Sequence, residues 1–216
     1  MSKIFFTSDL HFSHANIIKF CPTFRPQDVA EMDEYLIRKW NETVSPQDTV
    51  YNLGDVSFAR DIGRIEAVLR RLNGTHHLIF GNHDGLLRQH APRLLAECKW
   101  DGLPVLASAQ DYLLLDVPEI KQKMVLFHYP IQEWDGCHKG WYHLHGHIHD
   151  RTAKLRGRVL NVGWDLHGRF LTADDVDGFL RGLPKTAHFG DKNTPPDNAE
   201  TAAQAVRNAL RENNGL

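Results

Sequence analysis

Apolar runs and amphipathic segments alternate through the first half of the chain. Residues 4–8, 49–53 and 78–80 form apolar runs of strand length, and polar side chains or glycine follow each run closely. Between these runs, apolar residues recur at helical spacing over 29–44 and 62–72, with charged residues at many intervening positions. The order strand, helix, strand, helix, strand predicts βαβ connections and a parallel sheet.

The pattern changes after the third strand. Residues 86–97 have helical spacing, although Pro92 is expected to break or kink a helix there. Two strand-like segments, 111–117 and 123–127, are separated by a short turn that contains Pro118, and this arrangement predicts a hairpin.

The next extended segment, 142–149, carries four histidines at alternate positions, which would place them on one face of a strand. Basic residues follow, and we interpret them as a solvent-facing hairpin tip before a further strand over 158–162. A helix with a capping residue is expected to begin at 172–175.

The C-terminal part has a different composition. Residues 189–198 contain glycine and a proline pair and predict a linker, whereas 202–210 predict one short helix. We therefore expect a single domain over 1–188, followed over 189–216 by the linker and a short helix or flexible tail.

Composition excludes few classes of function. The chain has 216 residues, of which 42% are hydrophobic and 24% charged, as in an ordinary globular protein. A net charge of -2 gives no general electrostatic attraction for nucleic acid, although it is compatible with a local basic groove. The oligomeric state has no signature in the sequence.

Cysteine usage and the N-terminus bear on the compartment. The three cysteines are widely spaced and include no Cys-x-x-Cys pair, which favours a reducing compartment over a disulfide framework. The sequence passes from Met1 almost directly into a strand, and no apolar run has the length of a signal peptide or a membrane span. We therefore expect a cytoplasmic protein without a membrane partner.

Side chains with metal-binding atoms follow five of the predicted strands, at the edge where open α/β sheets form their binding sites. In chain order they are Asp9-x-His11, Gly54-Asp55, Gly81-Asn82-His83-Asp84, His128 and Gly146-His147-x-His149. The mixture of carboxylate, amide and imidazole groups suits two divalent transition metal ions. Ca²⁺ would prefer oxygen alone, and structural zinc would use cysteine.

Some of these residues also have simpler explanations. Asp9 could instead cap a helix over 15–20. His14 could contact a substrate, or it could support a metal ligand or cap the same helix. His143 and His145 could be structural.

The order and types of these residues resemble the calcineurin-like metallophosphoesterase superfamily, and the resemblance spans roughly residues 3 to 165. It implies that residues 1–188 form a metallophosphoesterase catalytic domain of the α/β class. The implied architecture is a four-layer α/β/β/α sandwich, in which helices lie outside two mixed β-sheets and the site lies above the strand ends.

The resemblance also implies a role for each matched residue. Asp9, His11 and His149 would bind a first metal ion, Asn82, His128 and His147 a second, and Asp55 both. His83 would stabilise the transition state or protonate the leaving group. Asp84 matches no ligand and is expected to position the loop or orient His83. The expected cofactors are two divalent metal ions, with Mn²⁺ preferred and Fe, Zn, Ni, Co or Mg as alternatives.

Two metal ions about 3.5–4 Å apart can share a hydroxide, lower its pKa and clamp the phosphoryl oxygens during in-line attack. The implied reaction is therefore hydrolysis of a phosphate ester without a covalent phosphoenzyme.

One departure from the superfamily narrows this expectation. Its Ser/Thr protein phosphatases extend Gly-Asp into Gly-Asp-x-x-Asp-Arg-Gly, whereas this chain continues from Asp55 as Val56-Ser57-Phe58-Ala59-Arg60. Protein phosphatase activity is therefore disfavoured. The chain more closely resembles small bacterial and phage members, whose opening motif also continues from Ser-Asp-Leu-His-Phe into a helix.

The substrate is the least determined feature. We expect a phosphodiester, on a nucleotide or a short nucleic acid, with a phosphomonoester as the alternative. His14, Tyr129 and Arg156 are candidate substrate contacts, although Tyr129 could instead pack within its loop and Arg156 could belong to the solvent-facing tip. A non-catalytic metal-binding scaffold and a structural metal-binding or nucleic-acid-binding module are the alternatives of another class.

Overall fold

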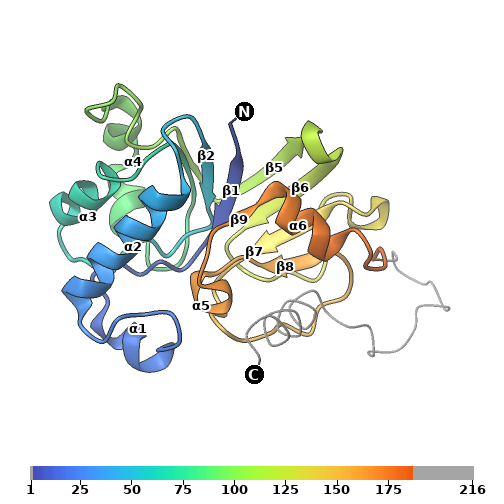
Figure 1. Ribbon diagram of the computed structural model, residues 1–216. Helices are drawn as coiled ribbons and strands as arrows, with labels where there is room; N and C mark the ends of the chain where they lie inside the picture. Colours follow the sequence, from blue (N-terminus) through green and yellow to red (C-terminus); the bar gives the residue numbers. More distant parts are fainter. Residues whose placement is uncertain (1, 187–216) are drawn as a thin grey trace.

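The computed structural model describes residues 2–186, which form an α/β fold with two mixed β-sheets (Figure 1). The predicted linker over 189–198 and the helix over 202–210 lie outside the described residues.

The first sheet has the strand order β4-β3-β2-β1-β9. Its strands are β1 (Ile4–Thr7), β2 (Thr49–Asn52), β3 (Thr75–Ile79), β4 (Ser108–Gln110) and β9 (Leu171–Thr172). The first four are parallel to their neighbours, and β9 runs antiparallel to β1. The predicted parallel sheet is therefore confirmed, while the short edge strands β4 and β9 have no clear signal in the sequence.

Four helices flank this sheet on the side away from the second sheet (Figure 1). They are α1 (Ala15–Phe20), α2 (Val29–Thr43), α3 (Ile62–Leu69) and α4 (Gly85–Ala96). Asp28 caps α2, because its carboxylate accepts from the backbone N–H groups of Ala30 and Glu31. The largest apolar cluster fills the space between helices and sheet, and Trp40 of α2 is one of its fully buried members.

Pro92 does not break α4, so the break expected from the sequence is wrong, while the alternative of a kink stays a prediction. Proline removes one intrahelical hydrogen bond, and here it does so on the exposed side of the helix. On the other side Leu87, Ala91 and Leu94 are buried against the core. Tertiary packing of that apolar face offsets the lost hydrogen bond, and the helix continues to Ala96.

The second sheet has the order β5-β6-β7-β8. Its strands are β5 (Tyr112–Val117), β6 (Gln122–Phe127), β7 (Tyr142–His145) and β8 (Val159–Asn161). β5 and β6 form the predicted hairpin, joined by the 3-10 turn η1 (Pro118–Ile120), whereas β6, β7 and β8 are parallel.

The predicted hairpin tip around Arg156 is therefore wrong. Parallel strands need a crossover connection of a dozen or more residues, and residues 146–158 provide it between β7 and β8.

A second apolar cluster lies between the two sheets. It combines Phe6 and Ile79 of the first sheet with Leu126 and Leu144 of the second. Helix α6 (Ala173–Leu180) adds buried residues to it, and Thr172 begins this helix with the predicted capping box. A short helix, α5 (Trp164–His167), follows β8.

Among the described residues, a loop covers the outer face of the second sheet. Trp134 and Cys137, which flank and begin the 3-10 turn η2 (Cys137–Lys139), pack there against Val125 and Val159. The layers in the described part are thus helices, sheet, sheet and loop.

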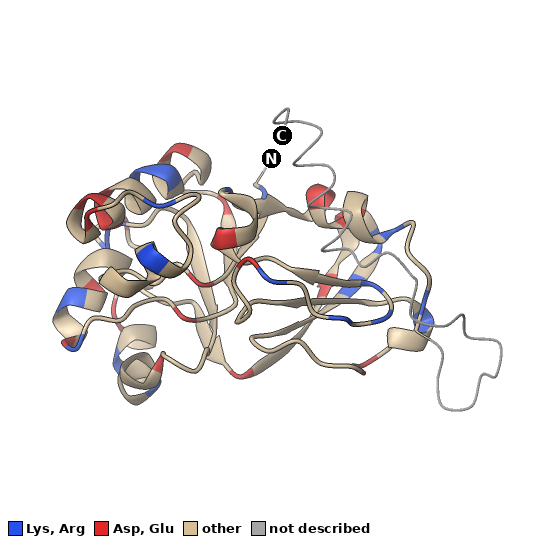
Figure 2. Ribbon diagram, turned by 90° about the horizontal axis from the view of Figure 1, so that it is seen from below, with Lys and Arg blue, Asp and Glu red and all other residues tan. Residues whose placement is uncertain are grey.

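In the described part of the chain, no helix is both long and apolar enough to cross a bilayer. All three cysteines are unpaired, and Cys21 and Cys137 are buried. Figure 2 shows basic and acidic residues interspersed over the helices, in agreement with the small net charge.

The burial of His76 in β3 has a testable effect on the stability of the protein. It is fully buried beside Trp40, and neither ring nitrogen has a hydrogen-bond partner among the described residues. Burial lowers the pKa of His76 to about 3. The unfolded chain, in which histidine titrates near pH 6.5, therefore binds more protons, and stability falls as the pH drops below about 6.5.

We expect His76→Leu to raise the free energy of unfolding at pH 7. Between about pH 4 and 6, unfolding of the variant should take up about one proton fewer than unfolding of the wild type, so its free energy of unfolding should fall less steeply as the pH drops. Urea unfolding at several pH values measures both effects. His77→Leu is the matched control, because it removes a ring that bonds Ser108 at 2.8 Å and stacks on Tyr51, and it should destabilise at pH 7. If the free energy of unfolding of His76→Leu falls with pH as steeply as that of the wild type, this account is contradicted.

Candidate metal centre

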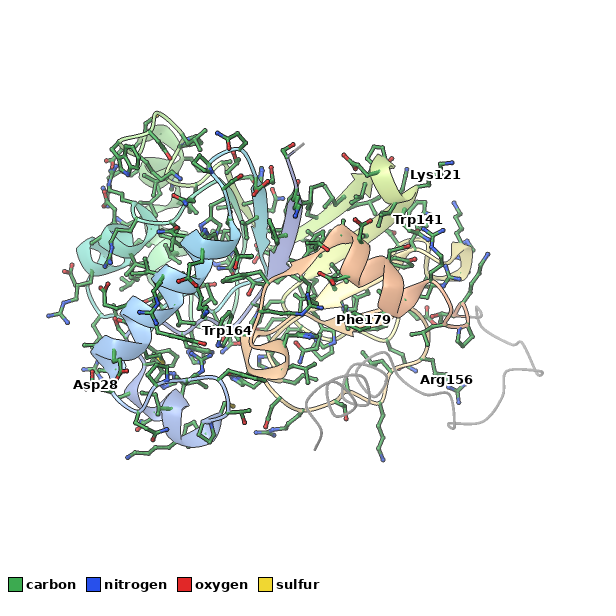
Figure 3. All side chains as sticks on the ribbon, viewed as in Figure 1. Asp28, Lys121, Trp141, Arg156, Trp164 and Phe179 are labelled. Atoms are coloured by element: carbon green, nitrogen blue, oxygen red, sulfur yellow. The ribbon has the colours of Figure 1, made fainter. Side chains whose placement is uncertain are left out.

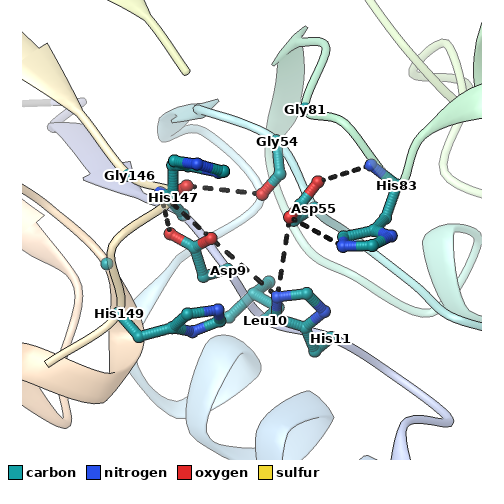
Figure 4. Close-up of polar contacts among 12 residues, drawn as sticks. Asp9, Leu10, His11, Gly54, Asp55, Gly81, His83, Gly146, His147 and His149 are labelled. Carbon is teal, nitrogen blue, oxygen red and sulfur yellow. Dashed lines mark hydrogen bonds and ion pairs between the residues drawn. The ribbon is translucent and has the colours of Figure 1, made fainter. Parts of the chain in front are cut away.

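The five polar motifs meet above the carboxyl ends of the strands, and Figure 4 shows residues from four of them, with His128 of the fifth 3.6 Å from Asp55. Asp9 follows β1, Asp55 follows β2, Asn82 follows β3, His128 follows β6, and His147 and His149 follow β7. Backbone hydrogen bonds join the loops within each sheet, from Asp9 N to Gly54 O at 2.9 Å and from Gly146 N to His128 O at 2.9 Å. Between the sheets, the backbone N–H of His147 donates to Asp9 Oδ2 at 3.0 Å. Residues from both sheets therefore contribute to one site.

The carboxylate of Asp84 holds two of the loops together. It is buried, and it accepts from the backbone N–H groups of Asp55, Val56 and Gly81 at 2.8 to 2.9 Å. Burial, the largest influence, raises the pKa of Asp84 in spite of these bonds. The structure thus places Asp84 below the site, where it positions the loops that carry Asp55 and His83.

Glycines let the loops approach closely. A Cβ atom added to Gly146 would lie 2.0 Å from Ser8 Oγ and 2.3 Å from Asp9 Oδ2. A Cβ atom on Gly81 would lie 2.2 Å from Asp55 Oδ1. Real side chains do not reach such distances, so the two carboxylates keep their positions only beside glycine.

The backbone of the site is strained. Left-handed φ angles occur at Asp9 (58°), His11 (52°), Asp55 (54°), His147 (69°) and His149 (54°). Asp and His tolerate this region better than most residues, yet each costs on the order of 1 kcal/mol or more and persists only where the surroundings impose it. Such strain gathers at functional sites.

This strain corrects the expectation of one extended histidine strand. β7 ends at His145, so only His143 and His145 lie within it. Both rings are buried and contact backbone carbonyl oxygens, His143 those of Val125 and Tyr129, and His145 that of Gly146. They are structural, and the left-handed turns at His147 and His149 direct the other two rings to the site.

A first cluster consists of Asp9, His11 and His149, whose potential ligand atoms lie within 4.8 Å of one another. His11 is 1% exposed, and neither of its ring nitrogens has a hydrogen-bond partner among the described residues. Its Nε2 lies 3.9 Å from Asp9 Oδ1 and 3.7 Å from Asp55 Oδ2, which is too far for a hydrogen bond. Asp9 belongs to this cluster and does not cap α1, whose N-cap residue is His14.

A second cluster consists of Asn82, His128 and His147. The Asn82 Oδ1 atom lies 3.0 Å from His128 Nε2 and 2.9 Å from His147 Nδ1. The other nitrogen of His128, Nδ1, lies 2.6 Å from the carbonyl oxygen of Leu53. Since both partners of His128 are oxygen acceptors, both of its nitrogens donate in this arrangement.

Asp55 lies between the clusters. Its Oδ2 atom is 3.6 Å from His128 Nε2 and 4.0 Å from His83 Nε2, and its Oδ1 atom accepts from the backbone N–H of His83 at 2.8 Å. The His83 side chain is 42% exposed, so a substrate can reach it.

The electrostatics reveal a shortage of positive charge. Burial raises the pKa of Asp9 to about 6. Burial lowers the pKa of His11 to about 2, so this imidazole is neutral and offers lone pairs. Burial also opposes ionisation of Asp55 and of His128, but their mutual attraction prevails, lowering the pKa of Asp55 to about 2 and raising that of His128.

These residues fit divalent cations. A neutral imidazole with two unpartnered nitrogens faces two carboxylates in a buried site, and an amide oxygen sits between two further imidazoles. Buried polar atoms nearly always have partners, and this donor set is typical of transition metals. The first cluster with Asp55 and the second cluster with Asp55 could each hold one ion.

Aromatic rings flank the site. His14 stacks on Phe58 at 3.6 Å between ring centroids, and Phe58 lies 4.3 Å from the ring of His83. Tyr129, 36% exposed, packs its ring against His128 and His147 on the side of the second cluster. His14 and Tyr129 are therefore both placed where a substrate could contact them.

Arg156 is not brought to the site. It is exposed on the crossover loop, its carbonyl accepts from Thr186, and its side chain lies at the periphery of the molecule (Figure 3). This loop returns along the second sheet to the start of β8, so it carries Arg156 away from the strand ends where the site lies.

Three contributors escaped the sequence analysis: Arg25, Phe58 and Asp165. Asp165 bonds His149 and Arg25, and Arg25 bonds the backbone of Asp9. Asp165 follows β8, so a sixth strand end with a carboxylate was a usable signal. Arg25 lies in a loop without any pattern.

No family model matches the chain. A Gene 66 protein of Mycobacterium phage D29 is 30% identical over 196 residues, which cover 82% of this chain and 94% of the phage protein. The chain belongs to the family of this phage protein. The Gene 66 protein of Mycobacterium phage L5 is 28% identical over 195 residues, or 82% of this chain and 93% of that protein.

Two further similarities are more limited. An uncharacterized protein of Methanocaldococcus jannaschii is 45% identical over 86 residues, so the match spans about half of that relative (48%) and 39% of this chain. The crystal structure of a protein of unknown function from Aquifex aeolicus has a TM-score of 0.62 at 18% identity and covers 83% of this chain and 100% of its own. The latter similarity supports the α/β fold alone.

The crowding at Gly146 gives a prediction. Gly146→Ala should displace the Asp9 carboxylate, lower the free energy of unfolding by about 1–3 kcal/mol and weaken binding of Mn²⁺. Thermal unfolding and calorimetric titration with Mn²⁺ measure these effects.

Gly178→Ala in α6 is the matched control, because its added Cβ meets nothing within 4 Å. It should stabilise the protein by about 0.5–1 kcal/mol and leave Mn²⁺ binding unchanged. Tight Mn²⁺ binding by Gly146→Ala would contradict the close approach described above.

Proposed function

We propose that the chain is a metal-dependent phosphoric ester hydrolase that prefers phosphodiesters and uses two divalent ions, preferably Mn²⁺. The observation that carries this proposal is His11. A buried imidazole with two unpartnered nitrogens faces the carboxylates of Asp9 and Asp55, beside a second cluster of compatible ligands.

Asp9, His11 and His149 would hold one ion, Asn82, His128 and His147 the other, and Asp55 would contact both. Bound there, two divalent ions supply a water of lowered pKa and draw negative charge from the phosphoryl oxygens. His128 must give up its Nε2 proton when the site is loaded, because an imidazole nitrogen binds metal only without its proton.

His83 contributes to the departure of the alcohol. Its backbone N–H donates to Asp55, which holds this part of the loop beside the proposed metal positions, and its ring is accessible, with Nε2 4.0 Å from Asp55 Oδ2. Its Nε2 atom donates a proton to the leaving oxygen as the P–O bond breaks, while water supplies the oxygen that joins phosphorus. The products are an alcohol and the phosphate with one ester bond fewer.

Phe58 favours a diester over a monoester. It occupies the position of the second acid in the protein phosphatase motif, and Ala59 occupies that of the arginine. An apolar ring against His83 disfavours the second negative charge of a monoester, which an arginine would otherwise pair. A nucleotide or a short nucleic acid fits, because its bases could stack on the rings of His14, Phe58 or Tyr129.

The finer fold assignment is part of this proposal. Two facing mixed sheets with helices outside the first are compatible with the four-layer sandwich of calcineurin-like metallophosphoesterases. In the described residues the loop with η2 stands in the place of the outer helical layer.

Hydrolysis of bis-p-nitrophenyl phosphate and p-nitrophenyl phosphate by the Mn²⁺-loaded protein tests the proposal. We expect faster cleavage of the diester. His83→Ala should lower kcat by about 10²- to 10⁴-fold with unchanged metal content, and Asp55→Ala should lose both activity and metal. His90→Ala on α4 serves as the control and should behave as the wild type.

Each alternative has its own outcome. A clear monoester preference would make the protein a phosphatase of the same mechanism. Two bound ions without cleavage of either compound, or of cyclic and linear dinucleotides, would favour the non-catalytic scaffold.

A further inference from the structure

The buried side chain of Arg25 binds the loop that carries Asp9 and His11 of the first cluster. The Arg25 side chain is 0% exposed, and its guanidinium donates to the carbonyl oxygens of Asp9 at 2.7 Å and Leu10 at 2.8 Å. These carbonyls flank the strained turn between Asp9 and His11. Two donors fixed in one plane can hold such a turn in a way that a flexible ammonium group cannot.

The same arginine reaches the first cluster by a second route. Its Nε atom donates to Asp165 Oδ1 at 2.6 Å, and the other oxygen of Asp165 lies 2.8 Å from His149 Nδ1. Asp165 is also 0% exposed. An ionised carboxylate only accepts, so His149 must carry its proton on Nδ1, which leaves Nε2 with a lone pair for the first cluster.

We propose that Arg25 and Asp165 are a positioning pair that sets the first metal position of this chain. The inference rests on the proposed function, since it assumes that the first cluster binds metal. Arg25 fixes the backbone of Asp9 and, through Leu10, that of His11, whereas Asp165 fixes the tautomer and the orientation of His149. One buried pair thus controls all three residues of the first cluster, and its hydrogen bonds among the described residues include none to the second.

A purely structural ion pair is the competing explanation. Two buried opposite charges often contribute little net stability compared with apolar residues. The two explanations differ over an isosteric amide. An asparagine at 165 has one acceptor and one donor group, so it cannot accept from both Arg25 and His149.

Asp165→Asn therefore leaves two arrangements. If its oxygen faces Arg25, its NH₂ group faces His149 Nδ1, and the histidine proton moves to Nε2, where it blocks metal binding. If the amide turns over, two donors meet at Arg25. Loss of such an orienting partner typically weakens metal binding 10- to 100-fold.

The experiment is calorimetric titration of the full chain with Mn²⁺, combined with electron paramagnetic resonance. The wild type should bind two ions and show the spin-coupled spectrum of a dinuclear site. Asp165→Asn should bind one ion as before and the other 10- to 100-fold more weakly, and at intermediate Mn²⁺ it should show the six-line spectrum of an isolated ion.

Asp48→Asn is the matched control. Asp48 is a buried carboxylate far from the site that accepts from the backbone N–H groups of Lys3 and Ser45. This variant should lose stability but keep two coupled ions. If Asp165→Asn does not fold, Arg25→Lys makes the same test, because it keeps the charge and loses the planar set of donors.

The outcomes separate this inference from the proposed function. Two equally tight ions in Asp165→Asn and Arg25→Lys would overturn the positioning role whatever the activity. If Asp165→Asn loses one ion selectively but the wild type hydrolyses no ester, the positioning role of the pair is supported and the proposed hydrolase function is rejected. A wild type that binds no Mn²⁺ would overturn both.

Discussion

The site depends on the close approach of the strand-end loops: the buried Asp84 carboxylate and Gly81 bring together two loops of the first sheet, and Gly146 brings the loop after β7 against the loop after β1. The Asp84 carboxylate accepts hydrogen bonds from three backbone N–H groups in two loops. A side chain at Gly81 would clash with Asp55, and one at Gly146 would clash with Asp9. The left-handed turns at five of the seven proposed ligands follow from this crowding. Packing of the two large apolar clusters must offset that strain, which sums to several kcal/mol or more.

The same crowding creates an electrostatic problem that a cation would relieve. Two carboxylates and several imidazoles lie in a site largely closed to solvent, and burial raises the pKa of Asp9 while it keeps His11 neutral. His128 lies 3.6 Å from Asp55, and although burial opposes its ionisation, contact with Asp55 raises the pKa of this imidazole. Arg25 is also close, but its donors are directed at carbonyl oxygens and Asp165, so it does not pair with the carboxylate of Asp9.

Much of this arrangement was predictable because it rests on periodicity and on strand ends. The parallel strands β1 to β3, the helices between them and the β5–β6 hairpin follow the apolar pattern, and the polar residues after each strand meet because parallel strands end at one edge. The path beyond β7 was not predictable, since left-handed turns at His147 and His149 depend on neighbours distant in sequence. The pairing of Arg25 with Asp165 spans 140 positions, and no local pattern encodes it. At Pro92 the opposite holds, because packing of the apolar face of α4 overrides the local preference of proline to end a helix.

The most direct test of a dinuclear centre is the anomalous diffraction of crystals grown with Mn²⁺. Our account predicts two manganese peaks, one contacted by Asp9, His11 and His149 and the other by Asn82, His128 and His147, with Asp55 in contact with both. Crystals without manganese at the strand ends would contradict it. So would a single peak among Cys21, His149 and Asp165, another group near the site whose ligand atoms lie within 4.8 Å of one another.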